Sequence, residues 1–186
     1  RRAVNAVQLI TVGTGDFAGY VGLLCRITPG LRIVAAVNPD TEQAERFARR
    51  HRIPGVYETL EAAMAAHPQA AVYLAVPHDL HASYLRVAID GSRAVLAEKP
   101  ITRLVDEGIA VVRQAVEARR AGAEPIQVAV NYQYRYDRPL ARAIATLDTG
   151  THGPALFARC LIPWRRDADY FANSPWHRSR DRAGGG

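Results

Sequence analysis

The sequence predicts an α/β protein in which a doubly wound parallel sheet is followed by the start of an incomplete α+β domain with an antiparallel sheet. Short apolar runs, several of them rich in β-branched residues, alternate with helical segments over residues 1–130, which is typical of a parallel sheet. A glycine-containing turn directly follows the first of these runs. Beyond residue 130 aromatic and polar residues alternate instead, which indicates a second domain over residues 131–186.

The expected strands of the first domain are short and apolar, and turn residues separate them from the helices. The strands cover residues 7–12, 32–37, a short stretch near 56, then 71–76, 94–97 and 126–130. Helical segments follow them over residues 17–27, 41–51, 60–66, 80–89 and 104–120. Asp40 or Thr41 is the expected cap of the second helix. Proline- or glycine-containing pairs end several of these elements, at residues 29–30, 54–55, 67–68 and 90–91.

The second domain is predicted to open with an extended segment over residues 131–136. In an extended chain Tyr132, Tyr134 and Tyr136 share one face. A helix over 139–147 and a long strand over 155–162 are expected next, followed by an aromatic, arginine-rich and irregular tail. The chain begins without methionine and stops in the triple glycine 184–186, so we expect both ends to be cut and the chain to be a fragment.

Composition restricts the setting and the function classes. A chain of 186 residues can bury a full core, and no apolar run approaches the roughly 20 residues that span a bilayer. Cys25 and Cys160 have neither metal-ligand spacing nor a disulfide framework, and no secretory signal is evident. We therefore expect a reduced, cytoplasmic protein without metal or membrane association. The net charge of +6 makes nucleic-acid binding an alternative, but interleaved acids favour solvated helix faces and no nucleic-acid partner.

The pattern Gly13-x-Gly15-x-x-Ala18 lies between the first strand and the first helix. In this setting it is typical of dinucleotide binding, with the pyrophosphate at the helix N-terminus. Gly13 permits the tight turn, Gly15 lets the backbone approach the phosphates, and Ala18 allows close helix packing. The intervening residues Thr14, Asp16 and Phe17 belong to the same predicted cofactor site.

The second strand ends in Asn38, where an acidic residue would bind the adenosine ribose of NAD. Asparagine can bond a ribose hydroxyl without repelling a 2′-phosphate, so we expect NAD or NADP as cofactor and leave the choice open. The fourth strand is followed by Pro77 and His81, which we also assign to the cofactor site. His81 either faces the nicotinamide or substrate, or is a helix-start histidine bonded to backbone. Asp79 is expected to act only as a cap.

Lys99 is the only lysine of the chain. Apart from the histidines, all the other basic residues are arginines. An ammonium can share a proton, whereas a guanidinium keeps its proton at any working pH. Pro100 fixes an extended turn at the end of the strand, and ligands bind at that edge of a parallel sheet. We therefore predict that Lys99 is catalytic and that Glu98 and Lys99 adjoin the cofactor.

Aromatic residues and arginines of the second domain are the candidate substrate contacts. Trp164 and Trp176, with nearby arginines, can stack on and hydrogen-bond a polyol or its anionic groups. The alternative for the tryptophans, and for the three tyrosines, is packing between the domains. The substrate residues that we single out are Tyr134, Arg135, Trp164, Trp176 and Arg178.

The order of these motifs resembles the Gfo/Idh/MocA family, the glucose–fructose oxidoreductase and inositol dehydrogenase type. The motifs are the glycine fingerprint, the Pro-x-x-x-His strand end, Glu98-Lys99-Pro100, the tyrosine-rich segment from Asn131, and the Trp-His-Arg stretch before the triple glycine. The resemblance extends over essentially the whole chain.

The resemblance implies an NAD(P)-dependent oxidation of a secondary alcohol on a sugar, cyclitol or related polyol, or the reverse reduction. It implies that Lys99 contacts the reacting hydroxyl and assists proton transfer, and that the full-length protein is a homo-oligomer. In the family the triple glycine leads into a segment with an aspartate and the acid–base histidine, which this chain lacks. The alternative is therefore a catalytically incomplete short form that binds a nucleotide or sugar.

Overall fold

The computed structural model describes residues 6–122 and 127–184 of the chain. It contains a six-stranded sheet in the order β3-β2-β1-β4-β5-β6, and all the strands are parallel. The strands are β1 (Val7–Val12), β2 (Leu31–Val37), β3 (Gly55–Tyr57), β4 (Ala71–Leu74), β5 (Val95–Ala97) and β6 (Val128–Val130). The strand order reverses between β1 and β4, and a crevice at such a point binds ligands in open α/β sheets.

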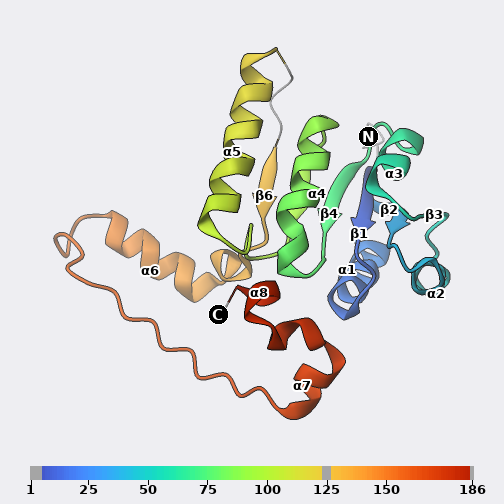
Figure 1. Ribbon diagram of the computed structural model, residues 1–186. Helices are drawn as coiled ribbons and strands as arrows, with labels where there is room; N and C mark the ends of the chain where they lie inside the picture. The colour runs from blue at the N-terminus through green and yellow to red at the C-terminus, as the bar shows by residue number, and fades with distance from the viewer. Residues whose placement is uncertain (1–5, 123–126, 185–186) are drawn as a thin grey trace.

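Helices cover both faces of this sheet and make it a three-layer domain (Figure 1). They are α1 (Asp16–Ile27), α2 (Thr41–His51), α3 (Leu60–Ala66), α4 (His78–Asp90) and α5 (Val105–Arg120). One apolar cluster joins the sheet to α3, α4 and α5, and a second joins it to α1 and α2. The parallel sheet that the apolar runs predicted is confirmed.

Strand β1 shows why these runs are mostly apolar rather than alternating. Leu9 packs in the cluster with α1 and α2, whereas Ile10 and Val12 pack in the cluster with α3, α4 and α5. A strand covered on both faces buries side chains of both, so most of its residues are apolar; the exceptions in β1 are Gln8 and the buried Thr11. The predicted cap of α2 is confirmed, because the carboxylate of Asp40 accepts a hydrogen bond from the backbone N–H of Gln43 over 2.9 Å.

The segment after β6 contains only helical elements and loops among the described residues. These are the 3₁₀ turn η1 (Gln133–Tyr136), α6 (Arg138–Asp148), α7 (Ala168–Asn173), the 3₁₀ turn η2 (Pro175–Arg178) and α8 (Arg180–Ala183). Figure 1 shows α6 and the loop after it projecting away from the sheet, while the red C-terminal segment returns beneath α4. Of the helices that the structure describes, none has the length and apolar character needed to cross a membrane.

Three predictions for this segment are wrong. Residues 133–136 are not extended, because local bonds such as Arg135 N–H to Tyr132 carbonyl, at 2.9 Å, close a 3₁₀ turn. Residues 155–162 form no strand, since no partner strand adjoins them within the described ranges, and Leu156 is 90% exposed. The tail expected to be irregular contains α7, η2 and α8.

β6 ends at Val130, where we placed the domain boundary, and the second domain itself stays a prediction.

Candidate cofactor and substrate site

The turn after β1 requires glycine at position 13. Gly13 has φ +91°, and a Cβ atom there would lie only 2.2 Å from the carbonyl oxygen of Ala75 in the loop after β4. Its N–H donates to the carbonyl of Val37 over 2.9 Å, at the end of β2. The turn is therefore held against both neighbouring strands, and no residue with a side chain fits there without moving backbone.

The N-terminus of α1 is open to an approaching ligand. Gly15 is the N-cap, without a side-chain cap bond, and a Cβ atom on it would meet no atom within 4 Å. The first helical bond runs from Gly19 N–H to Gly15 carbonyl over 3.1 Å, so the N–H groups of the first turn have no partner within the helix. Ala18 packs in the core, whereas Asp16 and Phe17 are exposed. This arrangement suits an anionic group such as a pyrophosphate.

Asn38 joins the glycine turn to the start of α2. Its side-chain N–H₂ lies 2.6 Å from Thr14 Oγ1 and 3.1 Å from Gln43 Oε1, and its Oδ1 accepts from the backbone N–H of Asp40 over 2.9 Å. Both donors of the amide are thus used inside the protein. The structure shows Asn38 as a residue that positions the turn, and its contact with a ribose stays a prediction.

The carboxylate of Glu98 links three strand ends and is not open to a ligand. Glu98 is only 8% exposed, and its Oε1 accepts hydrogen bonds from Tyr73 Oη at 3.0 Å and Asn131 Nδ2 at 2.8 Å. Burial, and then the adjacent Glu98 carboxylate, raise the pKa of Tyr73 far above its ordinary value. Glu98 therefore anchors the turn that carries Lys99. Sequence reasoning missed Tyr73 and Asn131 as its partners, because neither belongs to a motif.

Lys99 is exposed at the carboxyl end of β5 and lines a pocket of about 300 Å³. The segment after β6 and the loop after α6 supply the other walls, which are Tyr132, Gln133, Tyr134, Arg135, Leu140 and Trp164. The predicted catalytic lysine and the predicted substrate residues Tyr134, Arg135 and Trp164 thus come together. Trp176 and Arg178 are not among the residues that line this pocket.

His81 is fully buried and contacts backbone on both sides of its ring. Nδ1 lies 2.7 Å from the carbonyl oxygen of Pro100, and Nε2 lies 3.0 Å from that of Val76. A neutral imidazole carries one N–H and donates to only one of these oxygens. The contacts correspond to the alternative of a backbone-bonded histidine, which ties the end of β4 to the Lys99–Pro100 turn. Pro77 is the N-cap of α4 and is partly exposed beside it.

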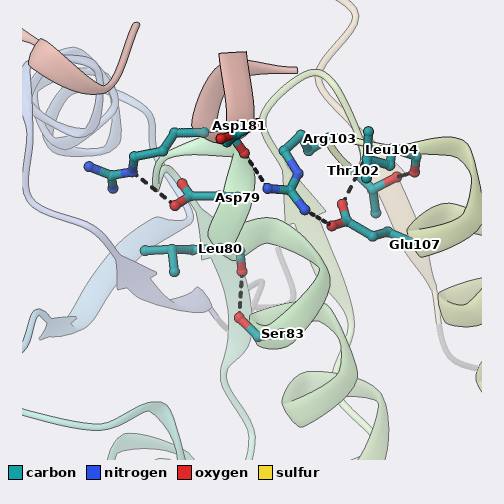
Figure 2. Close-up of polar contacts among 9 residues, drawn as sticks. Asp79, Leu80, Ser83, Thr102, Arg103, Leu104, Glu107 and Asp181 are labelled. Carbon is teal, nitrogen blue, oxygen red and sulfur yellow. Dashed lines mark hydrogen bonds and ion pairs between the residues drawn. The ribbon is translucent and has the colours of Figure 1, made fainter. Parts of the chain in front are cut away.

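Helix α8 is fastened to the N-terminal ends of α4 and α5 (Figure 2). Arg182 Nε donates to Asp79 Oδ2 over 2.9 Å, and Arg103 lies between Glu107, at 2.6 Å, and the carbonyl of Asp181. The expected capping role of Asp79 is wrong, because α4 has no side-chain cap bond and Asp79 pairs with α8 instead. The charged docking contacts lie far apart in the sequence, so no local pattern could have revealed them.

Histidine and aromatic rings form a second set of docking contacts. His78 Nδ1 lies 3.0 Å from the carbonyl oxygen of Ala183, and the His78 ring packs edge-on against Trp176 at 4.7 Å between centroids. The ring of His177 stacks on Tyr170 at 4.6 Å. Burial is the main cause that lowers the pKa of both histidines, and repulsion from Lys99 contributes to each.

Comparison with known proteins identifies related oxidoreductases. The profile of an oxidoreductase family with an NAD-binding Rossmann fold matches residues 7–123. Inositol 2-dehydrogenase of Mycolicibacterium smegmatis is 35% identical over 164 residues, which cover 85% of this chain and 45% of that protein. An NADP-dependent D-xylose 1-dehydrogenase of Haloferax volcanii is 39% identical over 77 residues, covering 41% of this chain and 24% of that protein. The chain thus spans less than half the length of these relatives.

Solved structures show the same fold. An oxidoreductase from Agrobacterium radiobacter, in complex with NAD+, L-tartaric acid and magnesium, superposes with a TM-score of 0.71 at 19% identity, over 92% of this chain and 48% of that chain. Myo-inositol dehydrogenase from Lactobacillus casei, in complex with NAD(H) and myo-inositol, gives 0.69 at 22% identity, over 78% and 42%. Together with the profile match over most of the chain, these findings show that the protein belongs to the Gfo/Idh/MocA family of oxidoreductases and carries its NAD-binding Rossmann fold.

Proposed function

We propose that the protein is an NAD(P)-dependent dehydrogenase or reductase that acts on a secondary alcohol or ketone of a sugar, cyclitol or related polyol. One observation supports this most strongly. The glycine turn after β1 and the Lys99 turn after β5 lie at the same edge of one parallel sheet, on either side of the loop that follows β4. That is the edge at which dinucleotides and their substrates bind in this class of fold.

The residues of this edge fit a dinucleotide. The free space over Gly15 leaves room for a pyrophosphate at the start of α1, and Gly13 cannot carry a side chain. Asn38 lies where the adenosine ribose is held in Rossmann folds, so it bears on the choice between NAD and NADP. The loops that carry Pro77 and Lys99 would adjoin the nicotinamide end. When bound, the nicotinamide accepts or supplies the hydride.

Lys99 is the residue that contacts the reacting oxygen in this proposal. Its ammonium has three N–H donors on a flexible stem, and within residues 6–122 and 127–184 the side chain of Lys99 forms no ion pair. Lys99 would hydrogen-bond the reacting oxygen and exchange a proton with it. In the reduction direction its ammonium would donate a proton to that oxygen and become the neutral amine, and in the oxidation direction the neutral amine would accept the hydroxyl proton. Glu98 and His81 would keep the turn in place, through Asn131 and the Pro100 carbonyl.

The setting and the assembly of the protein are part of the same proposal. Both cysteines are free, Cys25 in the core and Cys160 on the surface, which supports a reduced, cytoplasmic compartment. Exposed apolar side chains on α6, among them Leu140, Ile144 and Leu147, support association through the second domain as a homo-oligomer.

A fluorescence titration of the 186-residue chain with NADH and, separately, with NADPH tests the cofactor site. We expect saturable binding of at least one of the two, and Asn38→Asp should shift the preference towards NADH because a carboxylate repels a 2′-phosphate. Circular dichroism on the same sample establishes that the chain is folded. A folded chain that binds neither nucleotide contradicts the proposal.

A further inference from the structure

We propose that the substrate of the Lys99 pocket carries an anionic group on a hydroxylated ring, and that Arg135 binds this group while Lys99 contacts the reacting hydroxyl. The inference rests on the proposed function and narrows its substrate class to hydroxylated rings that carry a carboxylate or a phosphate. It follows from the charge of the pocket, the place of Arg135 beside Lys99 in its lining, and the aromatic walls.

The pocket has two cationic side chains and no acidic one. Lys99 and Arg135 both line it, and the remaining lining residues are uncharged. Within the described parts of the chain, neither cation forms an ion pair with a carboxylate. Two neighbouring positive charges without a counter-charge attract an anion and disfavour a neutral or cationic ligand of the same shape.

The acidic side chains closest in sequence are engaged elsewhere. Glu98 is buried and accepts from Tyr73 and Asn131. Asp137 caps α6, because its Oδ1 accepts from the backbone N–H of Leu140 over 3.0 Å. Each carboxylate therefore meets donors of its own. A guanidinium that has no internal partner presents two parallel N–H donors, which match a carboxylate or phosphate.

The turn that carries Arg135 is fixed to the turn that carries Lys99. Asn131, at the start of the segment, is bonded to Glu98, the residue before Lys99, over 2.8 Å. The N–H of Arg135 then donates to the carbonyl of Tyr132 over 2.9 Å, which closes the 3₁₀ turn. These links hold the two turns next to each other, so that Lys99 and Arg135 line the same pocket and can contact two groups of one ring.

The walls suit a single ring with hydroxyl groups. Tyr132, Tyr134 and Trp164 line the pocket, and side chains of this kind can stack on sugar-like rings and hydrogen-bond hydroxyls. Arg166 lies 4.0 Å from the centroid of the Trp164 ring, which helps to hold that ring in place. A volume of about 300 Å³ is at the lower end for small-molecule sites, so we expect a ligand of monosaccharide size.

Matched ligand pairs test the proposal on the chain loaded with its preferred dinucleotide. The pairs are D-glucuronate with D-glucose, and quinate with myo-inositol, and tryptophan fluorescence reports their binding. D-glucose 6-phosphate is added to separate a phosphate from a carboxylate as the anionic group. We expect the acid of at least one pair to bind ten-fold or more tightly than its neutral partner, with a difference that shrinks as salt is added.

Two variants of Arg135 test whether this residue causes the preference for the acid. Arg135→Gln should remove most of the preference for the acid and leave the neutral partner unchanged, whereas Arg135→Lys should keep part of it. Arg138→Gln is the matched control, because Arg138 begins α6 and does not line the pocket. Equal binding of acid and neutral partners, failure of every anionic probe to bind, or an equal loss in both arginine-to-glutamine variants overturns the proposal. The dinucleotide titration on the same sample separates these outcomes from a failure of the proposed function.

Discussion

The amide of Asn131 donates a hydrogen bond to Glu98 Oε1 over 2.8 Å, and this bond joins the end of β6 to the end of β5. The same oxygen accepts from Tyr73, so one carboxylate connects three neighbouring strands. Lys99 follows Glu98 directly, and the wall of its pocket follows Asn131. The bond is therefore a direct side-chain link between the segment of the proposed catalytic residue and the proposed substrate wall, beside the backbone bond from Asn131 N–H to the Ala97 carbonyl.

Asn131→Ala removes one donor from a buried carboxylate. We expect the free energy of unfolding to fall by about 1–3 kcal/mol, and the affinity for pocket ligands to fall as well, because the 3₁₀ turn loses its side-chain link to Glu98 and keeps only the backbone bond to Ala97. Urea denaturation and the ligand titration measure the two effects. Tyr73→Phe is the control, since it deletes the other donor from the β4 side and should change stability without changing ligand affinity. Unchanged ligand affinity in Asn131→Ala would contradict the anchoring role.

Lys99→Ala should remove turnover from a full-length version of the protein while the dinucleotide affinity stays within a few-fold of its original value. The proposed contact with the hydroxyl is lost, but the glycine turn is untouched. Lys99→Arg keeps the charge, yet we expect it to be nearly inactive, because arginine does not release its proton. Steady-state kinetics and the nucleotide titration check both variants, and turnover near the original rate in Lys99→Ala sinks the catalytic assignment.

Gly13→Ala should abolish dinucleotide binding and destabilise the fold. The added Cβ would meet the Ala75 carbonyl at 2.2 Å in a backbone region that alanine rarely adopts. Gly30→Ala is the control, because Gly30 also has a positive φ, at +80°, but open space around it. It should cost about 1–2 kcal/mol from strain alone and keep binding. Thermal unfolding and nucleotide titration compare the two, and equal effects would show that the close approach at Gly13 is unimportant.

Gly22→Ala in α1 should destabilise the protein by about 1 kcal/mol, because the clash outweighs the helix propensity that alanine adds. A Cβ at Gly22 would lie 2.6 Å from Nδ1 of His51, on α2. At Gly19, in the same helix, the nearest atom lies 4.0 Å away. Gly19→Ala should therefore stabilise by roughly 0.5–1 kcal/mol. Urea denaturation should give changes of opposite sign, and the same sign in both would contradict the packing.

Docking of α8 and η2 should weaken on acidification. In the docked protein the pKa of His78 and His177 lies below the ordinary value, chiefly because burial disfavours the imidazolium. The undocked state then binds protons more readily, so the docking free energy is fully present above about pH 6.5 and is lost as the pH falls below that value. The groups facing the two rings are the Ala183 carbonyl, His81, Lys99, Asp79, Arg166 and Tyr170.

Proton NMR titration of the histidine rings measures this effect. The signals of His78 and His177 should titrate below the ordinary pKa of a histidine side chain, because burial disfavours the imidazolium. The indole signal of Trp176, which packs against His78, should move over the same range. Titration of His78 and His177 at or above the ordinary histidine pKa would rule out the burial effect.

Most of the sheet could be predicted because its evidence is local. The apolar runs and the turn residues between them gave β1 to β5 and their helices, with differences of one or two residues at most ends. The 3₁₀ turn at Gln133–Tyr136 was missed because period-two tyrosines fit an extended chain equally well. The strand over 155–162 was predicted from composition, but a strand also needs a partner, which the segment itself does not specify.

The site was predictable to a different degree in its parts. The glycine turn and the solitary Lys99 can be recognised in the sequence, because each depends on the residue type at particular positions and not on the tertiary fold. The partners of Glu98 and the ion pair between Asp79 and Arg182 cannot be recognised in this way, since these contacts join residues that only the tertiary fold brings together. Trp176 shows the same limit. Its packing against His78 could not be seen from its residue type, and the substrate contact suggested by that type stays a prediction.

The central place of β1 also governs when the cofactor site is formed during folding. The turn at Gly13 takes its shape from the carbonyl of Ala75, beyond β4, and β4 pairs with β1 only after the chain has passed through β2 and β3. Parallel pairings of this kind close long loops and are slow to form. A nascent chain that has emerged only as far as β3 already contains the complete glycine sequence. It still lacks the loop after β4, against which the Gly13 turn packs. Nucleotide capture would then report that synthesis and folding have both passed β4.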